Sequence, residues 1–119
     1  MEKYNLKHYA HLGDAVYDVF IRRYIIDFAN NQKELHNLTT KYVNATFQYN
    51  LLNMLFDDLT EEEKELVRRG RNLPLTIAKR HNPKVHTSAT AFEVLIGYLY
   101  INDKKRLEDI FEIISKKAL

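Results

Sequence analysis

Two acids, each close to a glycine, are the residues of this chain whose types and spacing could do chemistry. Asp14 directly follows Gly13, and Gly97 comes four residues after Glu93, about one turn further along a helix. A glycine inside a helix costs about 1 kcal/mol relative to alanine, and close approach of another backbone is the usual reason for one. The pattern predicts that two helices cross near these glycines and bring the two carboxyl groups together.

Two carboxylates that meet at a half-buried crossing repel each other unless a cation or a proton lies between them. Mg²⁺ suits such a place because it prefers oxygen ligands. We therefore expect Asp14 and Glu93 to be metal ligands, although most acidic side chains on helices are simply solvated. Asp18 lies on the same helix face as Asp14. It could hold a water of the metal shell or pair with Arg22, and the sequence leaves both roles open.

The elements that must position these acids are helices. The chain has only three glycines and two prolines, and no Asn-Gly or Asp-Gly turn between alternating runs, so a β fold is not expected. Apolar residues recur at helical spacing, and Thr60–Glu63 reads as a capping box. The first helix has two apolar stripes, one of Leu12, Val16, Val19 and Phe20 and one of Tyr17, Ile21 and Ile25, so we expect it to be central or paired with a second subunit. The predicted core stripes of the last two helices are Phe92, Leu95, Ile96 and Leu99, and Leu107, Ile110, Phe111 and Ile114. We predict a single all-α domain over residues 1–119, a helical bundle with helices at about 4–29, 33–55, 60–69, 88–101 and 104–117 and a long loop at 70–87.

Composition limits the class of protein. The chain has 119 residues, 45% of them hydrophobic and 29% charged, and no cysteine. Disulfides and thiolate chemistry are therefore excluded, and a reducing compartment is expected. No apolar run approaches the length of a membrane span, and the polar start does not resemble a signal peptide. We expect a cytoplasmic protein with no membrane partner.

Charge is distributed unevenly along the chain. Residues 66–92 contain six basic residues and no acid, whereas the remaining residues carry twelve basic and sixteen acidic side chains. Such a basic segment indicates a polyanionic partner, although an ordinary solvated loop is the commoner case. The candidate residues for contact with this polyanion, in and next to the loop, are Arg68, Arg69, Arg71, Asn72, Lys79, Arg80 and Lys84.

The segments LGDAVYDVF (12–20) and TAFEVLIGYLY (90–100) resemble the two signature helices of the ribonuclease III family. With the basic RRGRN segment at 68–72 between them, and with no appended RNA-binding domain expected, the chain resembles the short branch of that family, the Mini-ribonuclease III enzymes. The resemblance covers nearly the whole chain. It implies a ribonuclease III endonuclease fold.

The resemblance also implies a function. Members of this family are homodimers that use Mg²⁺ to cut double-stranded RNA, and the short branch processes structured ribosomal RNA precursors. Asp14 and Glu93 match the family's metal-binding acids. The full-length enzymes have two further acids, and at those positions this chain has Ala10 and Thr90. The short branch is similar to this chain at both positions. The alternative is a catalytically silent dimer that binds double-stranded RNA on the same scaffold.

Overall fold

The computed structural model describes residues 4–119 and shows an all-helical fold, as predicted. Over these residues no strand is present, and two short 3₁₀ turns accompany the α-helices. The elements are α1 (Leu6–Ile25), α2 (Gln32–Val43), α3 (Ala45–Leu55), η1 (Phe56–Asp58), α4 (Glu61–Arg71), η2 (Ile77–Lys79), α5 (Pro83–Asn102) and α6 (Lys104–Ala118).

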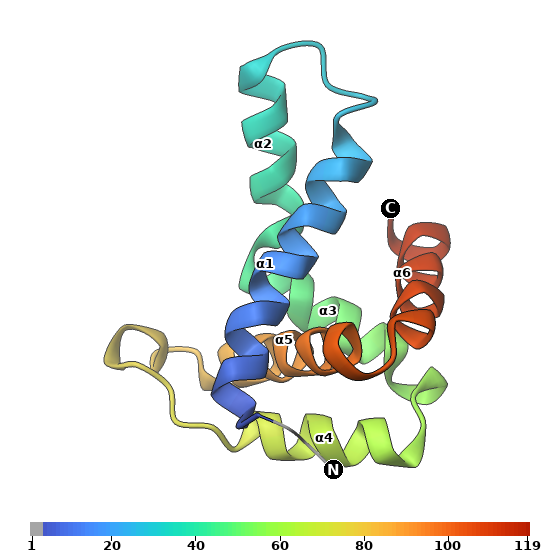
Figure 1. Cartoon of the computed structure of the whole chain (residues 1–119). Coiled ribbons are helices and arrows are strands. Elements are labelled where there is room, and N and C mark those ends of the chain that lie inside the picture. The colour runs from blue at the N-terminus through green and yellow to red at the C-terminus, as the bar shows by residue number, and fades with distance from the viewer. Residues whose placement is uncertain (1–3) are drawn as a thin grey trace.

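Helix α5 is the centre of the molecule. Its predicted core stripe is fully buried, and α1, α3 and α4 pack around it. Figure 1 shows α1 crossing α5 and then continuing away from it beside α2. A helix that is apolar on most sides is expected in such a central position. The stripe consists of Phe92, Leu95, Ile96 and Leu99.

Helix α1 has one buried apolar face and one that stays accessible. Tyr17, Ile21 and Ile25 are buried, and the Tyr17 hydroxyl donates a hydrogen bond to the Tyr42 carbonyl oxygen at 2.6 Å. Val19, on the other face, is 66% exposed. The core therefore buries one apolar stripe of this helix, whereas the other remains partly accessible to solvent.

The prediction of one helix over 33–55 is wrong, because the chain breaks at Asn44. Asn44 has an extended backbone conformation (φ −71°, ψ 161°). Its side-chain oxygen accepts a hydrogen bond from the Phe47 amide at 2.8 Å, and its side-chain nitrogen donates to the carbonyl oxygens of Thr40 and Lys41. One residue thus caps the end of α2 and the start of α3.

Two other predicted boundaries also differ from the structure. Helix α1 ends at Ile25 instead of residue 29, and α5 begins at Pro83 instead of residue 88. Proline is well accommodated at the first position of a helix, where its missing N–H would have no partner. The loop before α5 is accordingly shorter than predicted and contains the turn η2. The capping box is present: Glu63 N–H donates to the Thr60 hydroxyl at 3.1 Å, and Thr60 N–H to the Glu63 carboxylate at 2.9 Å.

Within residues 4–119, none of the helices combines the length and the apolar character needed to cross a bilayer.

Candidate active site

The crossing of α1 and α5 depends on two glycines. A Cβ atom added to Gly13 would lie 1.8 Å from the Glu93 carbonyl oxygen, and one added to Gly97 would lie 1.9 Å from the Tyr9 carbonyl oxygen. Real Cβ atoms do not approach backbone so closely, so any larger residue would force the helices apart. The close backbone approach predicted at these glycines is confirmed.

This crossing brings the carboxyl groups of Asp14 and Glu93 together. Asp14 is exposed, and Glu93 is half-buried. Burial raises the pKa of Glu93 to about 8, with further contributions from the negative charge of Asp14 and from hydrogen bonding between the two carboxyl groups, while the Lys79 ammonium acts in the opposite direction. Ionisation of both carboxyl groups is therefore unfavourable unless a cation lies between them.

The donor set fits a hard divalent ion that keeps much of its water shell. Across residues 4–119, no group of three or more His, Asp or Glu side chains is placed to hold a metal ion. Ala10 has no donor side chain, and the Thr90 hydroxyl donates to the His86 carbonyl oxygen at 2.9 Å. Two carboxylates with water and substrate oxygens are a set that Mg²⁺ accepts.

Asp18 pairs with Arg22 on the surface of α1. The Arg22 Nε atom lies 3.1 Å from a carboxylate oxygen of Asp18, and both side chains are substantially exposed, at 64% and 38% respectively. This pairing is one of the two roles that the sequence left open for Asp18.

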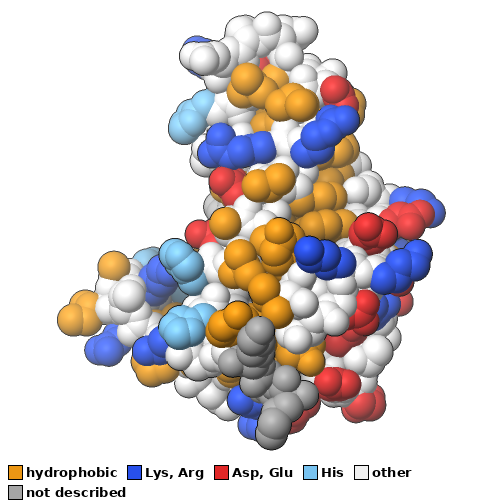
Figure 2. Space-filling view, viewed as in Figure 1, with side chains coloured by type: hydrophobic (Ala, Val, Ile, Leu, Met, Phe, Trp, Pro, Cys, Tyr) orange, Lys and Arg blue, Asp and Glu red, His pale blue; other side chains and the backbone are white. Residues whose placement is uncertain are grey.

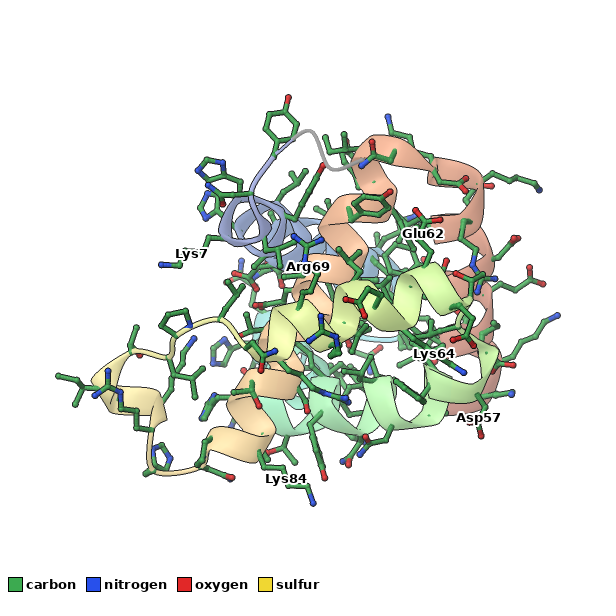
Figure 3. All side chains as sticks on the ribbon, turned by 90° about the horizontal axis from the view of Figure 1, so that it is seen from below. Lys7, Asp57, Glu62, Lys64, Arg69 and Lys84 are labelled. Carbon is green, nitrogen blue, oxygen red and sulfur yellow. The ribbon has the colours of Figure 1, made fainter. Side chains whose placement is uncertain are left out.

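The basic residues predicted to contact RNA lie in different surroundings. Lys79, on η2, is the one whose charge acts on Glu93. Arg68 pairs with Glu65, with its Nε atom 2.9 Å from the carboxylate. Arg69, labelled on α4 in Figure 3, lines a cavity between α4, α5 and α6. Arg71 lies 5.9 Å from the centre of the Phe56 ring. Asn72, Arg80 and Lys84 are exposed.

An apolar groove of about 570 Å³ runs between α1 and α6. Phe20 from α1 and Phe111 from α6 stack in it with ring centres 4.0 Å apart, and Val19 lies at its edge. Figure 2 shows the hydrophobic side chains gathered along α1 on this face. The partly accessible apolar stripe of α1 predicted one wall of this groove. The other wall comes from α6, about ninety positions further along the chain, and the sequence did not predict it. The lining residues include Leu12, Ala15, Val16, Tyr100 and Leu107.

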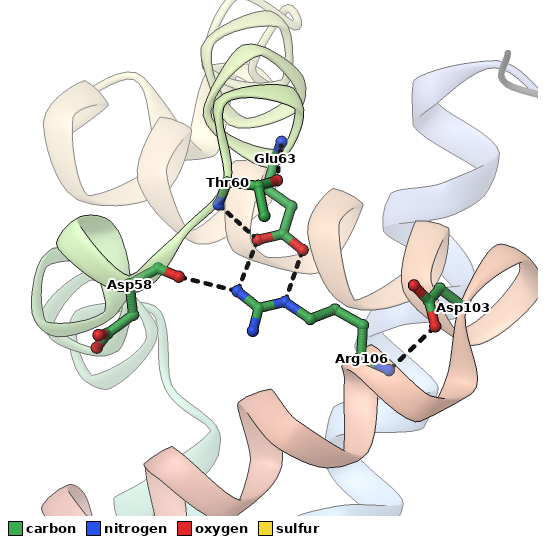
Figure 4. Close-up of polar contacts among 5 residues, drawn as sticks. All are labelled: Asp58, Thr60, Glu63, Asp103 and Arg106. Carbon is green, nitrogen blue, oxygen red and sulfur yellow. Dashed lines mark hydrogen bonds and ion pairs between the residues drawn. The ribbon is translucent and has the colours of Figure 1, made fainter.

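A separate polar cluster joins α4 to α6 (Figure 4). The Arg106 guanidinium donates to both carboxylate oxygens of Glu63, at 2.8 and 2.9 Å, and to the Asp58 carbonyl oxygen at 2.9 Å. Only 8% of the Glu63 side chain is exposed. Glu63 and Arg106 border a cavity of about 470 Å³ between α4, α5 and α6, at a place distinct from the Asp14–Glu93 pair.

Comparison with known proteins gives a consistent result. The family model described as "Ribonuclease III domain" matches residues 7–104. Mini-ribonuclease 3 of Thermoanaerobacter sp. (strain X514) is 42% identical over 107 residues, covering 87% of this chain and 75% of the relative. Mini-ribonuclease 3 of Enterococcus faecalis is 37% identical over 114 residues, covering 92% and 86%. A Fusobacterium nucleatum protein with a crystal structure superimposes with a TM-score of 0.83 at 29% identity, covering 99% of this chain and 97% of that one.

Proposed function

Because this chain belongs to the ribonuclease III family, in its Mini-ribonuclease 3 branch, we propose that it is a Mg²⁺-dependent endoribonuclease specific for double-stranded RNA. Membership of the family makes it a ribonuclease. The observation that carries the finer proposal is the convergence of Asp14 and Glu93 at the glycine crossing, where burial and the neighbouring carboxyl group raise the pKa of Glu93 to about 8.

The roles of the residues follow from this geometry. Asp14 and Glu93 are the ligands that would hold Mg²⁺, and the chemistry that the bound ion supplies is charge neutralisation and activation of water for in-line hydrolysis of a phosphodiester. Glu93 carries a proton near neutral pH in the metal-free protein and must release it to bind a cation. The Lys79 ammonium, close to this pair, attracts the phosphate toward it. No side chain serves as a nucleophile.

The substrate follows from the charge distribution and the family. Double-stranded RNA is recognised mainly through its shape, phosphates and 2′-hydroxyls, and the acid-free segment 66–92 offers cations for such contacts. We infer that the RNA-binding residues are Arg68, Arg69, Arg71, Asn72, Lys79, Arg80 and Lys84. We propose that the natural substrate is a structured ribosomal RNA precursor in the cytoplasm, as the resemblance of the sequence to this family implies.

The apolar groove between α1 and α6 supports a homodimer. Val19, 66% exposed, stands beside the stacked pair of Phe20 and Phe111. Neighbouring exposed apolar side chains are a common feature of protein interfaces, and a second copy of the chain presents the same surface. A dimer has two carboxylate pairs, so each can cut one strand of a duplex.

A cleavage assay tests the proposed function. Wild-type protein is incubated with a long RNA duplex and Mg²⁺, next to Asp14→Asn, Glu93→Gln and a chelator control, and RNA binding is measured in parallel. We expect cleavage by the wild type alone, with binding retained in both variants. Binding without cleavage by the wild type would instead support the silent RNA-binding dimer, which the absence of acids at positions 10 and 90 allows.

A further inference from the structure

A basic and aromatic surface lies on α3 and on the adjoining ends of α4 and α5. We call it the Tyr49 patch, and it consists of Tyr49, Asn53, Arg71 and Lys84. Helix α3 carries no charged residue, and Asn53 and Lys84 are exposed while Tyr49 is half-buried. Figure 3 shows Lys84 at one end of this face and Asp57 at the opposite end, so the acids of η1 lie away from the patch.

Three members of the patch are in contact with one another, and the fourth, Arg71, is near enough for its charge to act on Tyr49. The Lys84 ammonium lies 5.8 Å from the centre of the Tyr49 ring. The side chains of Asn53 and Lys84 hydrogen-bond to the Tyr49 hydroxyl and lower its pKa, and the positive charges of Lys84 and Arg71 act in the same direction. A phenol, an amide and two cations are thus held together on an accessible surface.

These groups match the two polar components of an RNA backbone. Cationic side chains bind phosphates, while a phenol and an amide, which both donate and accept hydrogen bonds, match the 2′-hydroxyl that distinguishes RNA from DNA. We propose that the Tyr49 patch binds the sugar–phosphate backbone of duplex RNA, with Tyr49 and Asn53 contacting 2′-hydroxyls and Arg71 and Lys84 contacting phosphates. This inference rests on the proposed function, and it adds α3 to the RNA-binding surface.

The patch lies apart from the carboxylate pair. Lys84 precedes Glu93 by nine residues on α5, which places it about 14 Å away along the helix axis and on the other side of the helix. The patch therefore contacts a part of the duplex away from the scissile bond. It contributes to affinity and to the choice of RNA over DNA, and takes no part in the chemical step.

Binding measurements on a cleavage-blocked protein test this inference. In a Glu93→Gln background, Tyr49→Phe and Lys84→Ala are compared with the matched controls Tyr24→Phe and Lys33→Ala, which make the same chemical changes on α1 and α2. The ligands are an RNA duplex and the same duplex with 2′-fluoro sugars, which keeps the A-form but lacks the hydroxyl. Thermal unfolding of each variant checks that the fold is intact.

Tyr49→Phe is expected to weaken binding of the RNA duplex by about threefold to tenfold, the usual effect of one lost hydrogen bond, and to leave binding of the 2′-fluoro duplex unchanged. Lys84→Ala is expected to weaken binding of both duplexes. It should also reduce, by about 1, the slope of the logarithm of the binding constant against the logarithm of the salt concentration. The controls should match the parent.

The outcomes separate this inference from the proposed function. Parent-like binding by both patch variants would overturn the inference and leave the nuclease proposal intact. Equal weakening of the two duplexes by Tyr49→Phe would contradict the 2′-hydroxyl contact. A wild-type protein that binds through the patch but does not cleave would refute the nuclease proposal alone, and a parent protein that binds no duplex would refute both.

Discussion

At the scale of single residues, Gly13 and Gly97 place the two acids. Because these glycines have no side chains, the backbones of α1 and α5 can touch. Glu93 takes part in both the backbone contact and the carboxyl pair: its carbonyl oxygen faces Gly13, and its carboxyl group interacts with Asp14. Elsewhere in a helix a glycine lowers stability. Here it is required by the packing that creates the site.

This packing predicts an unusual response to alanine. In an ordinary helix interior, Gly→Ala stabilises by about 1 kcal/mol, whereas Gly97→Ala should destabilise by about 2 kcal/mol or more, because the new Cβ would overlap the Tyr9 carbonyl oxygen. Gly70→Ala should cost less, because the nearest atom there is 2.9 Å away, at Ala91. Urea unfolding measures both. A stabilised Gly97→Ala protein would contradict the close crossing.

The protonation of Glu93 predicts how stability changes with pH in the absence of metal. Its pKa is raised from 4.5 to about 8 in the folded protein, so between these values the folded state holds a proton that the unfolded state has lost. The free energy of unfolding should therefore fall as the pH rises from about 5 to 8. Added Mg²⁺ should restore stability at pH 8, where it replaces the proton.

Urea unfolding of wild type and Glu93→Gln, each with a chelator, measures this effect. The difference between the two proteins isolates Glu93 from the other titrating groups. Wild-type stability should fall relative to the variant over this pH range. Parallel pH profiles would show that the pKa of Glu93 is not raised in the folded protein.

At the scale of elements, the sequence predicts helix type better than helix boundaries. The apolar stripes of α5 and α6 and the capping box of α4 are all present as predicted, because each depends on residues three or four apart. The break at Asn44 was missed, because apolar spacing continues through it and only the two-sided capping by its side chain reveals it.

Long-range pairing is the other element-scale feature that was not predictable. Glu63 reads from the sequence as part of a capping box, which it is, but its contact with Arg106 joins residues 43 positions apart. The Asp14–Glu93 pair spans a larger separation, and it was predictable only because two glycines and a family resemblance marked it. Nothing comparable marks Arg106.

The pair between α4 and α6 carries its own prediction. Arg106→Ala should destabilise the fold by about 2 kcal/mol or more, because it leaves the buried Glu63 carboxylate without its cation. Lys116→Ala, which breaks the exposed pair with Glu112 on the same helix, should have no measurable effect. Chemical denaturation distinguishes them. Equal stability of the two variants would mean that the pair does not hold α6 in place.

At the scale of the whole molecule, the groove between α1 and α6 is the interface of the proposed dimer, which would bring two carboxylate pairs to one duplex. Its stacked pair of Phe20 and Phe111 and its exposed Val19 form one continuous apolar surface. Covering that surface with a second copy removes apolar area from water, which is the main driving force for association.

Val19→Asp should therefore convert a dimer to a monomer. Val19 is 66% exposed in the single chain, so the change should leave the fold of each chain intact. Ile77→Asp, at a residue that is 81% exposed on η2, is the matched control and should remain dimeric. Light scattering after gel filtration measures the mass. A dimeric Val19→Asp protein would place the interface elsewhere.

The claim on which all of this depends is that Asp14 and Glu93 act as one unit through a shared cation. Single-turnover cleavage of an RNA duplex by wild type, Asp14→Asn, Glu93→Gln and the double variant tests it most directly. Residues that act as a unit give non-additive losses, so each single variant should lose nearly all activity, on the order of 10³-fold or more, and the double variant should be no worse. Losses that multiply in the double variant, or wild-type activity in either single variant, would contradict the account.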